Sequence, residues 1–371
     1  MAWTIEEIER NWMNGEPLGS ASEEILAAFE MAEAIRGPDW VRSTTFLAGG
    51  ARQWGFSALL PILSLANRAS SLKNAVDAND LLHRLRSDDA AADSELSAIH
   101  LLRSSNPATE LEIAPIAAVG DRQRRPDFRI RMPADRWTHV EVTELHQSSA
   151  GTIAEQVLQT VVCEIMAVER AFLLEVVFWR FPSEGEIQDL VAQARSICSM
   201  AEPQRVDLSD LAWLILKPGD PSAVIPTALP PGDGPRVAAS QVLVGDGQPN
   251  RQVIVRMPFS DRRAEDVLAA EASQLPKDTP GLIMVDVRHQ PTAFSSWPTL
   301  VPRRFTPFMH TRVGAVILFM HGIRLTDTGL ALLPHLKMIE NPHAHLPLPP
   351  WIKETVEQLR EALKTTTGQP N

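Results

Sequence analysis

Two carboxylates stand on neighbouring segments that alternate polar and apolar residues. Asp127 lies in the segment 126–132, and Glu141 lies in the segment 137–144, fourteen residues further on. Side chains of a strand point alternately to its two faces, so each acid lies opposite the apolar residues of its own segment. If the two strands are neighbours, both acids reach one face of a sheet, where oxygen ligands suit Mg²⁺ or Mn²⁺. We expect Asp127 and Glu141 to bind such a cation, with the main-chain carbonyl of Val142 as a third oxygen ligand.

A divalent cation in this position suits one kind of reaction. It polarises a phosphate group and lowers the pKa of an attacking water molecule. Hydrolysis of a phosphodiester bond is therefore the chemistry that this pair of acids predicts.

A third carboxylate, Glu95, falls on the apolar side of a predicted helix. It shares that side with Ala92, Ile99 and Leu102, where a charge is costly unless it is paired or binds a metal. Glu95 therefore either orients the cation or the water, or pairs with an arginine from the segment 122–131. The alternatives for the other two acids are a turn-capping role for Asp127 and a solvated strand face for Glu141.

These residues resemble a known family. The sequence Pro126-Asp127 followed by Glu141-Val142-Thr143, with Glu95 on the preceding helix, resembles the PD-(D/E)XK nuclease superfamily, whose fold is restriction-endonuclease-like. The resemblance covers residues 91–181, about a quarter of the chain. It implies an Mg²⁺-dependent nuclease, acting on DNA rather than RNA, with a context in restriction, repair or defence.

The chain departs from the family pattern at Thr143, where the motif has lysine. In the family this lysine is expected to position the water and to stabilise charge on the phosphate, and threonine carries no charge. Arg129 or Arg131 are candidates for the cationic role, and Gln156 on the following helix is a candidate for the positioning role. The expected catalytic residues are Glu95, Asp127, Glu141, Thr143 and Gln156.

Arginines cluster around these acids in an otherwise acidic chain. The formal net charge is −11, which argues against a broadly basic surface that binds nucleic acid. Arginine forks match phosphate oxygens, so we expect a local group to hold the nucleic-acid backbone; the alternative is exposed loop arginines that offset Asp121 and Asp135. This group is Arg124, Arg125, Arg129 and Arg131.

The surrounding pattern predicts an α/β protein in three parts. Residues 1–90 read as a helical region with capping boxes at Thr4 and Ser20, residues 91–204 as the nuclease domain, and residues 205–371 as an α/β extension. The middle part has the order helix, three strands, helix, strand, with the last strand at 172–181. This is the αβββαβ core with a mixed sheet that the resemblance implies.

Composition restricts the class of protein further. With 44% hydrophobic and 22% charged residues, the chain reads as a globular protein. It lacks a run of about 20 apolar residues, and its acidic N-terminus does not resemble a secretory signal, so we expect a cytoplasmic protein without a membrane segment. Two cysteines exclude a disulfide framework. A homodimer or a partner protein stays possible.

Two other functions remain open. The first is a catalytically inactive PD-(D/E)XK-like scaffold that binds nucleic acid or protein; the missing lysine and the acidity favour it, whereas the three acids favour the enzyme. The second is an accidental motif, with an unrelated activity in the C-terminal half. Divalent-cation binding that depends on Asp127 distinguishes the enzyme from the binder.

Overall fold

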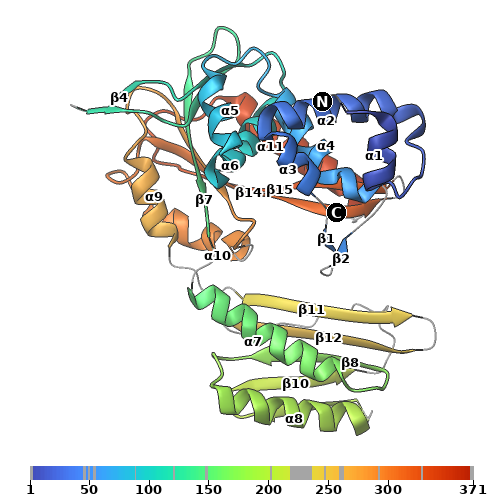
Figure 1. Ribbon diagram of the computed structural model, residues 1–371. Helices are drawn as coiled ribbons and strands as arrows, with labels where there is room; N and C mark the ends of the chain where they lie inside the picture. The colour runs from blue at the N-terminus through green and yellow to red at the C-terminus, as the bar shows by residue number, and fades with distance from the viewer. Residues whose placement is uncertain are drawn as a thin grey trace. The chain divides into compact units, whose positions relative to one another are not determined.

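The computed structural model is a mixed α/β protein with two compact units (Figure 1). Unit 1 comprises Met1–Leu145, Ala264–His289 and Val301–Asn371, and unit 2 comprises His146–Arg263 and Gln290–Leu300. The structure describes residues 3–44, 47–48, 51–52, 56–87, 89–119, 122–146, 149–200, 203–217, 236–245, 248–258, 263–290, 293–326 and 329–367. The boundaries predicted near residues 90 and 204 fall inside unit 1 and unit 2, because strands from distant parts of the chain share a sheet.

Helices occupy most of the N-terminal region, as the sequence predicts. Thr4 caps the first helix by accepting the N–H of Glu7 at 3.2 Å. The expected box at Ser20 does not form: residues 19–21 make a 3₁₀ turn, and the next helix begins without a side-chain cap. The described elements are α1 (Ile5–Trp12), η1 (Gly19–Ala21), α2 (Ser22–Arg36), α3 (Pro38–Ser43), β1 (Leu47–Ala48), β2 (Ala51–Arg52), α4 (Phe56–Ser70) and α5 (Ala78–Arg86).

The sheet of unit 1 has the order β15-β14-β13-β7-β6-β3. Its strands β3, β6 and β7 pair antiparallel, whereas β7, β13 and β14 pair parallel and β15 returns antiparallel. A short separate hairpin, β4 with β5, lies between β3 and β6 in the chain. The bounds are β3 (Glu110–Ile113), β4 (Ala117–Val119), β5 (Arg122–Arg124), β6 (Phe128–Arg131), β7 (Thr138–Glu144), β13 (Gly281–Asp286), β14 (Val313–Thr326) and β15 (Gly329–Glu340).

Helices pack against both faces of β7. Val140 belongs to the same buried cluster as Ile99 of α6 (Ala90–Arg103) and Met284 of β13, so α6 covers that face. The opposite face carries Thr143, whose side chain bonds to Glu271 of α9 (Ala264–Ala272). Glu141 therefore lies on the α9 face with Thr143, by the alternation of a strand.

The predicted fourth strand of the core belongs elsewhere, and this part of the fold prediction is wrong. Strand β8 (Phe172–Phe178) pairs with β12 and β10 in unit 2, and the parallel neighbour of β7 is β13. Both β8 and β13 are buried along their whole length. An apolar run predicts a strand covered on both faces, but it does not say which sheet the strand joins.

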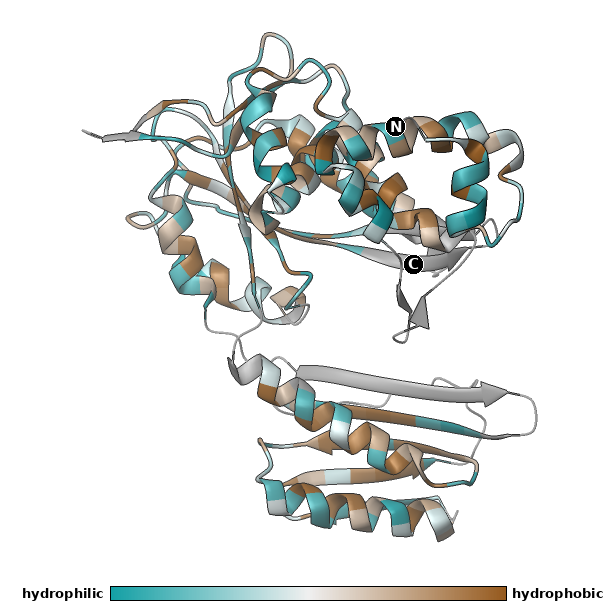
Figure 2. Ribbon diagram, in the orientation of Figure 1, coloured by the Kyte–Doolittle hydropathy of each residue, from teal (hydrophilic) through white to brown (hydrophobic). Residues whose placement is uncertain are grey.

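Unit 2 is a mixed sheet with two long helices, α7 (Ser149–Met166) and α8 (Glu184–Met200) (Figure 1). The strand order is β11-β12-β8-β10-β9. Alternate side chains of β8, such as Leu174 and Val176, share a buried cluster with Leu158 of α7 and Leu190 of α8, and Figure 2 shows how apolar β8 and β10 are. The bounds are β9 (Gln204–Leu208), β10 (Ala212–Lys217), β11 (Arg236–Gly245) and β12 (Gln248–Pro258).

Three further helical elements complete the described chain: α10 (Ala293–Leu300), η2 (Val301–Arg304) and α11 (Pro350–Thr367). Helix α11 contacts β15 and α6. Among the helices of the described residues, none is long and apolar enough to cross a membrane.

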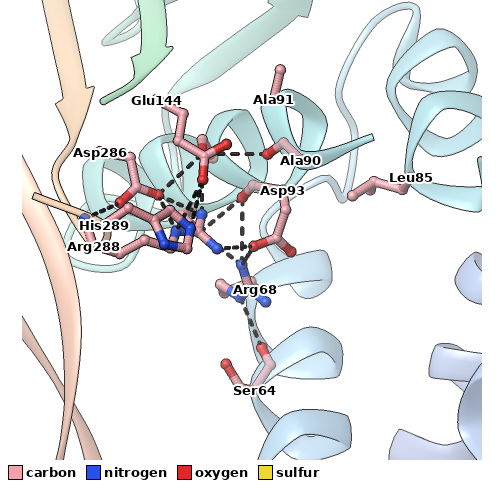
Figure 3. A network of polar contacts seen from close by, with 12 residues as sticks. Ser64, Arg68, Leu85, Ala90, Ala91, Asp93, Glu144, Asp286, Arg288 and His289 are labelled. Atoms are coloured by element: carbon pink, nitrogen blue, oxygen red, sulfur yellow. Dashed lines mark hydrogen bonds and ion pairs between the residues drawn. The ribbon is translucent and has the colours of Figure 1, made fainter. Parts of the chain in front are cut away.

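A polar network ties the parallel strands of unit 1 to its helices (Figure 3). Arg288, just after β13, donates to Asp286 and, at 3.0 Å each, to Asp93 and Ser94 of α6. Arg68 of α4 lies 3.1 Å from Asp93. Burial alone would raise the pKa of Asp93, but the charges and hydrogen bonds of Arg68 and Arg288 lower it to about 2. The network therefore fixes α4 and α6 against the ends of the strands.

Replacing Arg288 by alanine is expected to destabilise the protein. The change leaves Asp286, whose side chain is 3% exposed, without its arginine. Removing one partner of a fully buried pair costs about 3–5 kcal/mol, and because Arg288 itself is 34% exposed, we expect a loss at the lower end of this range. Urea unfolding measures the loss. The control is Arg360→Ala, which removes an exposed pair with Glu357 and should cost less than about 1 kcal/mol. Equal effects of the two changes would show that the network is not a stabilising element.

Candidate active site

Asp127 and Glu141 meet on one face of the sheet. Phe128 pairs with Val140 across β6 and β7, so the residue before Phe128 faces the one after Val140. The Oδ2 atom of Asp127 accepts the N–H of Val142 at 2.6 Å, and the carboxyl groups of Asp127 and Glu141 are hydrogen-bonded to each other. The structure therefore brings together the two acids expected to bind a cation.

The two acids resist ionisation. Burial, and then the charge of Glu95, raises the pKa of Asp127 to about 7. Burial, and then the charge of Asp127, raises the pKa of Glu141 to about 10. A hydrogen bond between two carboxyl groups needs a proton on one of them, so the pair holds a proton at neutral pH.

One oxygen of this pair has no partner. Glu141 is 2% exposed, and its Oε1 atom is buried without a hydrogen bond among the residues that the structure describes. Leaving a buried polar atom unpaired costs about 1–3 kcal/mol. A ligand that contacts Oε1 of Glu141 would remove this cost.

Glu95 lies nearby but is bound to an arginine. Arg84 of α5 donates to both of its carboxylate oxygens, each at 2.5 Å. Burial raises the pKa of Glu95, while Arg84 opposes the shift; the hydrogen bond that Arg84 donates to Glu95 raises the pKa of Arg84. An arginine does pair with Glu95, but it comes from α5 and not from the segment 122–131.

Sequence reasoning missed a fourth acid, Glu271 of α9. It accepts hydrogen bonds from the hydroxyl of Thr143 and, at 3.3 Å, from Nε2 of Gln274. Its charge contributes to the raised pKa values of both Asp127 and Glu141. Only the parallel pairing of β7 with β13 places α9 here, and a single sequence carries no signal for that pairing.

The arginines of β6 already have acidic partners. Arg129 bonds to Glu112 at 2.5 Å and Arg131 to Glu110 at 2.6 Å, both across to β3. The ring of Trp137 lies 4.6 Å from the first guanidinium and 4.4 Å from the second. A phosphate would have to compete with these carboxylates.

The remaining predicted residues are more dispersed. Arg124 is half-buried at the end of β5, and Arg125 is exposed in the loop that follows. Gln156 is exposed on α7, which belongs to unit 2, whereas the acids belong to unit 1.

The donor set fits a hard cation with few protein ligands. Among the described residues, no three side chains of His, Cys, Asp or Glu are arranged to hold a metal ion. Asp127 and the unpartnered Oε1 of Glu141 offer two carboxylates, and Mg²⁺ commonly binds through one or two carboxylates while keeping several waters. The role of the Val142 carbonyl stays a prediction.

No protein-family model matches the chain, and no curated protein or solved structure matches it either.

The raised pKa values predict how stability depends on pH. A carboxyl whose pKa is higher in the folded protein contributes stability below its unfolded pKa, near 4, and loses it as pH rises through the folded value. Glu141→Gln removes this loss, so we expect it to stabilise the protein at pH 8 by about 1–3 kcal/mol. Thermal unfolding between pH 5 and 8 measures it.

The control is Glu357→Gln, a change of equal charge at an exposed site. If Glu141→Gln behaves like this control at every pH, the pKa of Glu141 is not raised in the folded protein.

Proposed function

We propose that the chain is a divalent-cation-dependent hydrolase of phosphodiester bonds, with DNA as the expected substrate. Asp127 and Glu141 would hold the cation, Mg²⁺ or Mn²⁺. The observation that carries the proposal is the buried, unpartnered Oε1 of Glu141 beside Asp127 on the neighbouring strand. Without a cation, the two carboxyl groups share a proton. A bound cation favours their ionised form, and both can then act as its ligands.

The order of elements in unit 1 supports the same proposal. Helix α6 and strands β3, β6 and β7 are followed, beyond unit 2, by α9 and β13, which pack on or pair with β7. This order is αβββαβ, the core implied by the resemblance to the PD-(D/E)XK superfamily. In this interpretation unit 2 is an insertion between β7 and α9, and the nuclease core is not residues 91–204.

The residues around Asp127 and Glu141 have supporting roles in this proposal. The N–H of Val142 holds Asp127 in place, and the surrounding sheet keeps Glu141 away from bulk water. Arg84 balances the charge of Glu95, which fits a supporting role for Glu95 better than a ligand role. A bound divalent cation supplies a polarised phosphate and a more acidic water.

A second function is favoured by specific observations. Thr143 supplies no positive charge, Arg84 neutralises Glu95, and Arg129 is already paired. These features suit a scaffold that binds a nucleic acid or a protein without cleaving it. The binding scaffold ranks second because it gives no role to the buried pair of acids with raised pKa values.

Turnover assays distinguish the two functions. Linear duplex, circular duplex, single-stranded DNA and RNA are incubated with the full chain and Mg²⁺, Mn²⁺ or chelator. We expect cleavage of at least one DNA substrate, loss of cleavage with chelator, and at least a roughly 100-fold lower rate for Asp127→Asn.

The matched control is Glu357→Gln, the same acid-to-amide change at an exposed residue of α11 that pairs with Arg360. It should keep a rate within about threefold of the unchanged protein. Nucleic-acid binding without turnover under every condition would favour the scaffold, and binding of neither cation nor nucleic acid would leave the motif accidental.

A further inference from the structure

Glu271 belongs to α9, which follows the segment His146–Arg263 of unit 2 in the chain. Its carboxylate accepts the hydroxyl of Thr143 on β7 and the side-chain amide of Gln274, one turn further along the chain. It is close enough to Asp127 and Glu141 to influence the charge of both. Helix α9 contacts β7 and β13, so this arrangement is part of the packed core.

Glu271 differs from Glu95 and Glu141 in its surroundings. Glu95 and Glu141 are each 2% exposed, whereas Glu271 is only half-buried. Glu95 is bound to an arginine, while the hydrogen bonds to Glu271 come from neutral donors. Asp127 is also half-buried and accepts a neutral N–H, but the proposed function assigns it to the cation. Of the remaining three acids, Glu271 is the one that combines access to solvent with neutral hydrogen-bond donors.

Thr143, which donates a hydrogen bond to Glu271, lies at a key position of the motif. Thr143 occupies the place where the resemblance implies lysine, and its hydroxyl is directed to Glu271. The unpartnered Oε1 of Glu141 lies on the same face of β7, so a ligand is expected beside these residues. A threonine in this place carries no positive charge, but its hydroxyl can orient a carboxylate.

We infer that Glu271 is the general base of the hydrolysis, held in position by Thr143 and Gln274. The inference rests on the proposed function. The Glu271 carboxylate accepts a proton from the attacking water as the water oxygen forms a bond to phosphorus. The bond from phosphorus to the leaving oxygen breaks, and the leaving oxygen takes a proton from bulk water. The products are a phosphate monoester and a free hydroxyl group.

Chemical rescue tests this role. In Glu271→Ala, the turnover number should fall by at least about 100-fold, while KM for the substrate and the affinity for Mn²⁺ stay within about threefold. Added formate, a small carboxylate, should restore at least a tenth of the lost activity, because the vacated place is open to solvent. The control Glu265→Ala removes another acid of α9, which pairs with Arg304, and should keep full activity.

Loss of activity together with lost Mn²⁺ binding makes Glu271 a cation ligand and overturns the inference, as does loss without formate rescue in a folded variant. Near-UV circular dichroism checks folding, and Glu271→Gln, which keeps the volume, replaces the alanine variant if that one unfolds. Full activity of either variant also overturns it, while an inactive unchanged protein overturns the proposed function itself.

Discussion

The hydrogen-bonded pair of Asp127 and Glu141 is the interaction on which the site depends. Both carboxyl groups are turned toward one face of β6 and β7, and burial raises the pKa of each. Natural proteins keep such unfavourable groups mainly where function needs them. The neighbours agree with this view, because Arg84 neutralises Glu95 but no basic residue is hydrogen-bonded to the pair among the residues that the structure describes.

Long-range strand pairing is what assembles the site. Strand β7 supplies Glu141 and Thr143, and its parallel partner β13 anchors α9, which supplies Glu271. The network around Arg288 then fixes α6, with Glu95 on it, against the same strands. Unit 2 interrupts this assembly in the chain without supplying the acids. The proposed nuclease core therefore lies in segments from both sides of unit 2.

Local features of the fold were predictable from the sequence, and long-range ones were not. Alternation around Asp127 and Glu141 predicts two strands and the face of each acid, and the spacing around Glu95 predicts its place on the apolar side of a helix. The apolar run at 172–181 also predicts a strand, but nothing in it distinguishes the sheet of unit 2 from the sheet of unit 1. For the same reason Arg84 and Glu271 were missed.

Binding of Mn²⁺ to the full chain is the decisive measurement for the proposed cation site at Asp127 and Glu141. The electron paramagnetic resonance signal of free Mn²⁺ falls as the ion binds, so a titration at pH 8 gives the number of sites and the affinity. We expect at least one site per chain that is lost in Asp127→Asn and retained in Glu110→Gln. Absence of binding by the unchanged protein, or equal binding by Asp127→Asn, would contradict this expectation.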